Sequence, residues 1–219
     1  ITGDPKTGWK LSHFVPDCTQ LDPHESGQTR RAMEMARALH EADATLERSF
    51  DFYAESKRYE ALLRERCGVI DVPGFEDMAA RMERLHDFAM TDETYTCLCH
   101  NDFFHLNFLV GKDDSISLID WEYAGMQDPH VDIAMFCIYA LYDRAQVDRL
   151  IDLYFPEGCA DAVRVKIYGY IAACGLLWSN WCEYKRMLGV EFGEYSLRQY
   201  QYAKEYYQIV CRERKRLGL

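Results

Sequence analysis

The sequence lacks a surplus of basic residues, which excludes one large class of partners. Its 25 Lys and Arg residues are outnumbered by 36 Asp and Glu residues, giving a formal net charge of -11. A nucleic-acid or anionic-membrane surface would need a basic footprint. We therefore expect neither nucleic acid nor a membrane as a partner, and the negative field instead favours cationic ligands.

Long apolar runs and paired cysteine motifs are also missing. No stretch approaches 18 uncharged apolar residues and no basic region followed by an apolar run opens the chain, so we expect neither a transmembrane helix nor a signal peptide. The nine cysteines contain no CxxC pair, so we expect no zinc site and interpret them as small apolar residues. We expect all nine to be reduced, in a cytoplasmic protein.

Helical periodicity dominates the patterns that are present. Residues 1–15 contain a turn and an alternating run at 9–15 that is typical of a strand. Asp22 and Glu25 predict the start of a helix, and apolar spacing predicts six more. Those six run from about Thr45 to Gly68, over about 75–90, and over 130–142, 145–155, 160–188 and 194–216. The predicted fold class is α+β and mostly helical.

The most informative polar residues flank a predicted hairpin in the middle of the chain. Apolar runs at 108–110 and 116–119 enclose the turn signal Gly-Lys-Asp-Asp. Asn107 enters this hairpin and Asp120 leaves it, so strand pairing brings together an amide oxygen and a carboxylate, which suit a hard cation. Asp102 lies five residues before Asn107. Any one of these residues alone is more often a turn former, but together they predict phosphoryl transfer.

These motifs resemble a known family. His100-Asn101-Asp102, Asn107 and Ile119-Asp120-Trp121-Glu122-Tyr123 are similar to the choline/ethanolamine kinase family, particularly its bacterial LicA-type branch. That family belongs to the wider aminoglycoside-phosphotransferase and protein-kinase-like superfamily. The resemblance implies the C-terminal lobe of a protein-kinase-like fold with a small catalytic β-hairpin. It also implies an amino alcohol as substrate, with ATP and Mg²⁺ as cofactors.

The resemblance also assigns roles to the residues around the hairpin. Asp102 would be the catalytic base or the carboxylate that orients the hydroxyl, and His100 would be a structural residue of the catalytic loop. Asn107 and Asp120 would bind magnesium. Asp132 would brace the loop through hydrogen bonds to its backbone.

An aromatic substrate pocket follows from the same resemblance. Tyr123 and Trp178 fall where the family places rings around a quaternary ammonium, which cannot donate hydrogen bonds and is held by π-faces. Glu122 would add negative charge there or assist the metal site. Trp181 and Tyr184 share roughly one helical face with Trp178 and serve either ligand contact or helix packing.

The N-terminal residues resemble the end of the small lobe of such a kinase. Residues 1–15 correspond to its last strand and the hinge, with Phe14 and Val15 near the adenine, and residues 16–219 correspond to the helical lobe. No G-x-G-x-x-G or P-loop string occurs in the sequence. We therefore expect the N-terminal nucleotide lobe to be absent from these residues, ATP binding to be weak and turnover of choline to be poor.

Two other hypotheses about the function remain open from the sequence alone. One is a related kinase acting on thiamine, an aminoglycoside or an amino sugar, although the aromatic residues favour a compact alkylammonium. The other is a non-catalytic module that binds a cationic metabolite. The oligomeric state is also open, with a dimer as one option.

Overall fold

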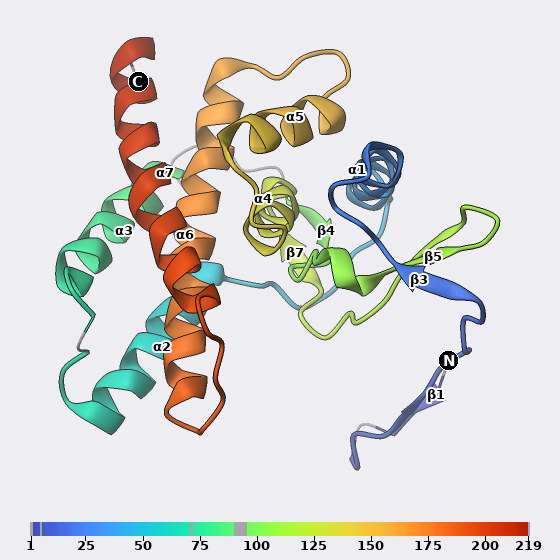
Figure 1. The fold of residues 1–219 in the computed structure, drawn as a ribbon, viewed down its shortest axis with the longest axis horizontal. Helices are drawn as coiled ribbons and strands as arrows, with labels where there is room; N and C mark the ends of the chain where they lie inside the picture. Colours follow the sequence, from blue (N-terminus) through green and yellow to red (C-terminus); the bar gives the residue numbers. More distant parts are fainter. Residues whose placement is uncertain (1, 5, 71, 90–95, 219) are drawn as a thin grey trace.

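The helices are grouped around α6, the longest helix of the molecule (Figure 1). The computed structural model describes every residue except 1, 5, 71, 90–95 and 219. α7 packs along α6, and α2, α3 and α4 also contact it, whereas α1 packs on α5. The helices are α1 (Ser26–His40), α2 (Phe52–Cys67), α3 (Phe75–Ala89), α4 (His130–Tyr139), α5 (Arg144–Tyr154), α6 (Asp161–Arg186) and α7 (Tyr195–Leu217).

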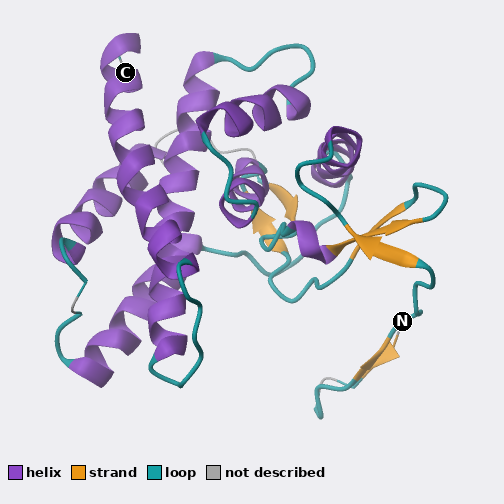
Figure 2. Ribbon diagram, in the orientation of Figure 1, coloured by secondary structure: helices purple, strands orange, loops and turns teal. Residues whose placement is uncertain are grey.

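Within the described part of the chain, three small antiparallel sheets accompany the helices (Figure 2). The first pairs β1 (Thr2–Gly3) with β2 (Lys10–Leu11). In the second, β5 (Phe108–Gly111) lies between β3 (Cys18–Gln20) and β6 (Ile116–Leu118). The third pairs β4 (Cys97–Cys99) with β7 (Gly125–Gln127). This arrangement confirms the predicted α+β, mostly helical class and the hairpin, which is here part of a three-stranded sheet.

Helix α4 lies at the centre of the hydrophobic core. Every residue from Val131 to Tyr139 is buried, which is typical of a helix that is covered on all sides. Its neighbour α6 crosses α7 so closely that a Cβ at Gly175 would lie 2.7 Å from the carbonyl oxygen of Gln199. Glycine is therefore required at this crossing.

The predicted helices are present, but two of them begin later than expected. The first begins at Ser26 because Glu25 is its N-cap, accepting hydrogen bonds from the amides of Gly27 and Gln28, whereas Asp22 accepts one from the amide of His24 in the preceding turn. The second begins at Phe52 and has Asp51 as its N-cap. It ends at Gly68, as predicted, where φ is 72°.

The N-terminal strand is shorter than its alternating pattern suggested. Of the run 9–15, only Lys10–Leu11 is a strand, and it pairs with Thr2–Gly3 rather than with the hairpin. Trp9 and Leu11 are exposed, so the alternation does not reflect a buried face. The strand that does pair with the hairpin is Cys18–Gln20, which we did not predict.

No helix among the described residues combines the length and apolar character that crossing a membrane requires.

Candidate active site

The carboxylate of Asp132 binds the backbone of the predicted catalytic loop, residues 100–107. Asp132 is fully buried in the first turn of α4. Its Oδ2 accepts a hydrogen bond from the backbone amide of His100 at 2.9 Å, and its Oδ1 accepts one from the amide of Asn101 at 2.8 Å. The Nε2 of His40, at the end of α1, lies 3.0 Å from Oδ2. Three segments distant in the sequence therefore meet at one carboxylate.

Asn101 gives the loop its sharp bend. Its φ of 61° lies in the left-handed region, which asparagine adopts more readily than most residues. The side chain is completely buried, and its Nδ2 donates to the carbonyl oxygens of Tyr123 at 3.1 Å and Gly125 at 3.3 Å. These bonds tie the loop to the segment that follows the hairpin.

His100 connects the loop to the exit of the hairpin. Its Nε2 lies 2.9 Å from the carbonyl oxygen of Ile119, and its Nδ1 accepts a hydrogen bond from the amide of Asp102 at 3.3 Å. A ring that accepts at Nδ1 carries its hydrogen on Nε2, so it donates to Ile119. The ring is fully buried. Its two hydrogen bonds fix the backbone of the loop relative to Ile119.

Asp102 is oriented by hydrogen bonds from two directions. The hydroxyl of Tyr139, from α4, donates to its Oδ1 at 2.5 Å, and the Nδ2 of Asn107 donates to its Oδ2 at 3.1 Å. Burial raises the pKa of Asp102 above its ordinary value, and the nearby Asp120 carboxylate adds to this effect, whereas the bonds from Tyr139 and Asn107 oppose it. The site therefore presents a fixed carboxylate that is more basic than usual.

Asn107 and Asp120 lie at the same end of the hairpin. The backbone amide of Ile119 donates to the carbonyl oxygen of Asn107 at 2.9 Å, which extends the pairing of β5 and β6 to this point. The Nδ2 of Asn107 is used by Asp102, so its amide oxygen faces away from that carboxylate. Asp120 is exposed and has a φ of 65°. An amide oxygen and an exposed carboxylate fit the hard oxygen ligands that Mg²⁺ prefers.

A row of aromatic rings leads away from Asp102. Tyr139 packs against Phe104 on one side, with ring centroids 4.5 Å apart, and against Trp178 on the other, at 5.5 Å. Tyr123 and Trp178 meet edge to face, with ring centroids 6.3 Å apart. Trp178 is only 7% exposed, and its indole nitrogen donates to the sulfur of Met135. The structure thus places Tyr123 and Trp178 on the Tyr139 side of Asp102.

The remaining predicted pocket residues lie at increasing distance from this row. Trp181 packs on Trp178 with centroids 5.4 Å apart and on Phe192 at 5.1 Å. Tyr184 faces Tyr59 of α2 at 5.9 Å, one turn further along α6. Glu122 is exposed next to Tyr123, where its charge contributes to raising the Tyr123 pKa to about 12, mainly a consequence of burial.

Phe14 and Val15 lie in the segment that leads from β2 to β3. Phe14 is 88% exposed, and the carbonyl oxygen of Val15 accepts a hydrogen bond from the thiol of Cys18. Their assignment as adenine contacts therefore stays a prediction.

His105 is a half-buried histidine three residues after Asp102. Burial, with a smaller contribution from His24, lowers its pKa from 6.5 to about 4. Because the unfolded chain takes up the proton first, the stability from this neutral ring is fully present above pH 6.5 and is lost as the pH falls towards 4. We expect His105→Gln to flatten the decline in unfolding free energy over this range. Urea unfolding at several pH values checks this, and an unchanged decline would contradict it.

The sequence did not point to two residues that hold the site. Tyr139 donates to Asp102, and His40 contacts Asp132. Tyr139 lies seven residues after Asp132, two helical turns along the same face of α4, and this spacing is the signal that was available.

Known proteins with similar sequences and folds are phosphotransferases and kinases. Residues 7–168 match the model of the phosphotransferase enzyme family. The chain is 26% identical to the protein LicA of Haemophilus influenzae, over 90% of this chain and 76% of that protein. The structure of the choline kinase LicA from Streptococcus pneumoniae has a TM-score of 0.82 at 23% identity, covering 95% of this chain and 73% of that one. A structure of LicA in complex with AMP has a TM-score of 0.80 at 23% identity, covering 96% and 72%.

The family match covers the catalytic loop, the hairpin and α4, the elements that bring Asp102, Asn107, Asp120 and Asp132 together. The chain belongs to the phosphotransferase enzyme family.

Proposed function

We propose that this chain carries the acceptor side of an ATP-dependent kinase that phosphorylates the hydroxyl of choline or ethanolamine. The observation that carries this proposal is the row of rings formed by Tyr123, Trp178 and Tyr139, which ends at the oriented carboxylate of Asp102. The similarity to LicA, and to a LicA structure that holds AMP, supports it.

Asp102 is the proposed base or orienting group for the substrate hydroxyl. A hydroxyl that donates to its carboxylate is aligned for attack on a phosphoryl group, and positioning of this kind accounts for most of the catalysis in phosphoryl transfer. The hydrogen bonds from Tyr139 and Asn107 restrict the carboxylate to one orientation. Its raised pKa improves its ability to accept the proton as the bond to phosphorus forms.

Asn107 and Asp120 are the proposed ligands of magnesium. When bound with the nucleotide, the ion neutralises negative charge on the phosphates. The hairpin holds the two ligands at one end, and His100 fixes that end to the catalytic loop through Ile119. Phe14 and Val15 remain the proposed contacts of the adenine.

A compact alkylammonium fits the proposed substrate pocket. A trimethylammonium group cannot donate hydrogen bonds, so aromatic faces and nearby negative charge are what bind it. Tyr123 is half-buried and offers a face, and the buried Trp178 packs against it, with Glu122 beside Tyr123. Trp181 and Tyr184 extend the same wall along α6. The net charge of -11 adds a field that attracts a cation.

Substitutions at Tyr123 test the role of its ring. We expect Tyr123→Leu to weaken choline binding about fivefold to thirtyfold, since a cation–π contact contributes about 1–2 kcal/mol. Tyr123→Phe keeps the aromatic face and is expected to bind choline like the parent. Calorimetric titration measures both affinities, and equal losses in the two variants would contradict the ring as the binding element.

A ligand screen separates the proposed substrate from its alternatives. Choline or ethanolamine is expected to raise the melting temperature of the chain more than thiamine or kanamycin does, because a ligand that binds only the folded state stabilises it. Phosphate transfer from ATP, measured in the full gene context, then separates a kinase from a module that only binds a cationic metabolite. Binding without transfer would favour the module.

A further inference from the structure

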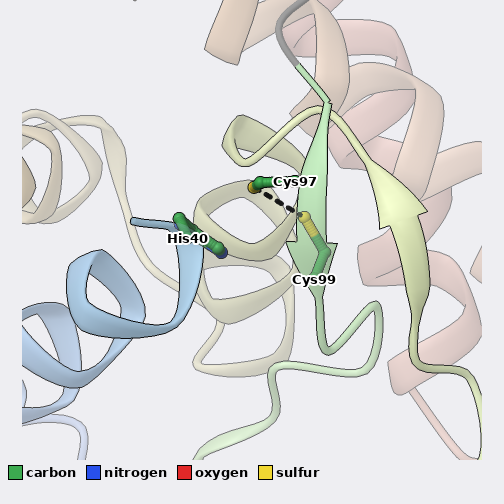
Figure 3. Close-up of side chains that lie close together, drawn as sticks. All are labelled: His40, Cys97 and Cys99. Atoms are coloured by element: carbon green, nitrogen blue, oxygen red, sulfur yellow. Dashed lines mark hydrogen bonds between the residues drawn. The ribbon is translucent and has the colours of Figure 1, made fainter. Parts of the chain in front are cut away.

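Three side chains of metal-binding type gather behind the catalytic loop. They are His40, at the end of α1, and Cys97 and Cys99, on β4 (Figure 3). One ligand atom from each lies within 4.8 Å of the others, and the two sulfur atoms are 3.7 Å apart. All three side chains are nearly or completely buried, with exposed fractions of 2%, 3% and 0%. None of them takes part in the proposed phosphoryl transfer.

Local structure explains the sulfur pair. Residues two apart in a strand project to the same face, so Cys97 and Cys99 both point towards α1. Zinc has bonds of about 2.3 Å to sulfur and tetrahedral angles, which place two thiolates about 3.8 Å apart. The observed separation of 3.7 Å therefore matches two positions of a tetrahedral site.

The hydrogen bonds of His40 leave it in a form that can bind metal. Its Nε2 lies 3.0 Å from the carboxylate of Asp132, which only accepts, so Nε2 carries the hydrogen. Its Nδ1 then has a lone pair, which accepts a hydrogen bond from the hydroxyl of Tyr154 at 2.8 Å. A histidine bound to metal through one nitrogen and to a carboxylate through the other is the usual arrangement in protein metal sites.

A cavity reaches the His40 side of the cluster, whereas Cys97 and Cys99 do not line it. A cavity of about 710 Å³ is lined by His40 and Tyr154, together with Arg37, Glu41, Asp128 and Lys166. The hydroxyl of Tyr154, which contacts Nδ1, is the group that an entering ion would displace or take as a ligand.

We propose that His40, Cys97 and Cys99 form a zinc site, with Nδ1 and two thiolates as ligands and the Tyr154 hydroxyl or a water molecule in the fourth position. Binding converts two thiols to thiolates and releases two protons to solvent. The bound ion polarises His40 and strengthens its hydrogen bond to Asp132, the carboxylate that holds the amides of His100 and Asn101. The site therefore stabilises the catalytic loop without contacting substrate.

The chemistry of the thiols sets the pH dependence of the site. Cys97 and Cys99 are thiols in contact with each other, and a thiol must lose its proton to bind zinc. Since metal binding must then displace both thiol protons, we expect the apparent affinity to rise about 100-fold for each unit of increasing pH. A site of exposed carboxylates would lack this steep dependence.

Titration with Co²⁺, followed by competition with Zn²⁺, tests the proposal. The background carries Cys67→Ser and Cys211→Ser, because these two exposed thiols would bind metal at the surface. We expect one Co²⁺ per chain, with the thiolate-to-metal charge-transfer band and the visible spectrum of a tetrahedral ion. Zn²⁺ is expected to abolish both signals and to raise the melting temperature.

Cys97→Ala and Cys99→Ala are expected to lose the charge-transfer band and the rise in melting temperature. Cys182→Ala, which removes a buried thiol from α6, is the matched control and should keep both. Cys99→Ser replaces Cys99→Ala if the latter does not unfold cooperatively. Absence of the band in the folded background protein overturns the proposal. Retention of the band in the variants of both Cys97 and Cys99 overturns it as well.

Discussion

Asp102→Asn is expected to reduce the rate of phosphate transfer by about 10²- to 10⁴-fold, the range for removal of a general base. Choline affinity should change little, since the rings that contact the ammonium group are untouched. Steady-state kinetics in the full gene context and calorimetric titration measure the two quantities. Asp113→Asn, in the exposed turn of the hairpin, is the matched control and should keep full activity. A loss below about tenfold would exclude Asp102 as the base.

The same substitution has a small and pH-dependent effect on stability. The variant loses the hydrogen bond from Asn107 but no longer buries a charge, so we expect its unfolding free energy to stay within about 1 kcal/mol of the parent. Because the folded pKa of Asp102 is raised, the parent loses stability as the pH rises from 3.8 through that pKa. Urea unfolding should therefore show that the unfolding free energy of the variant increases relative to that of the parent over this pH range.

Asp132→Ala is expected to lower the unfolding free energy by about 3–5 kcal/mol, because it leaves buried donors without an acceptor. The amides of His100 and Asn101 and the ring of His40 all lose their partner. The catalytic loop also loses its attachment to α4, so activity should fall with stability. Urea unfolding monitored by circular dichroism gives the free energy.

Two further variants make the test of Asp132 specific. Asp132→Asn keeps one acceptor oxygen and should give an intermediate loss. Glu34→Ala removes an exposed carboxylate from the middle of α1 and should change the free energy by less than about 0.5 kcal/mol. A loss below about 1 kcal/mol for Asp132→Ala would show that the loop is held by other contacts.

The local part of the site was predictable from sequence. Asn107 and Asp120 lie at the two ends of a short hairpin whose turn and strands are adjacent in the chain. Pairing of the strands was enough to bring the two residues to one end. The helices were predictable for a similar reason, since the apolar spacing of α3, α5, α6 and α7 reflects their packing.

Contacts between distant segments were not predictable in this way. Because α4 is apolar on all sides, its pattern does not show which face meets the loop, and Tyr139 was missed. The position of His40 depends on how α1 docks, which no local pattern specifies. The strand Cys18–Gln20 is three residues long and lacks clear alternation, so only its pairing with β5 defines it.

The contacts of Asp132 join segments that are far apart in the sequence, and this has a consequence for the order of folding. His40 and Asp132 are separated by 92 residues, and Gln127 bonds to Phe50 across 77. Closing such long loops costs chain entropy that is recovered only when both ends have docked. Helices such as α6 and α7, neighbours in sequence, can pair much earlier. We therefore expect the contacts of Asp132 with His40 and with the amides of His100 and Asn101 to form late in folding, after the pairing of α6 and α7.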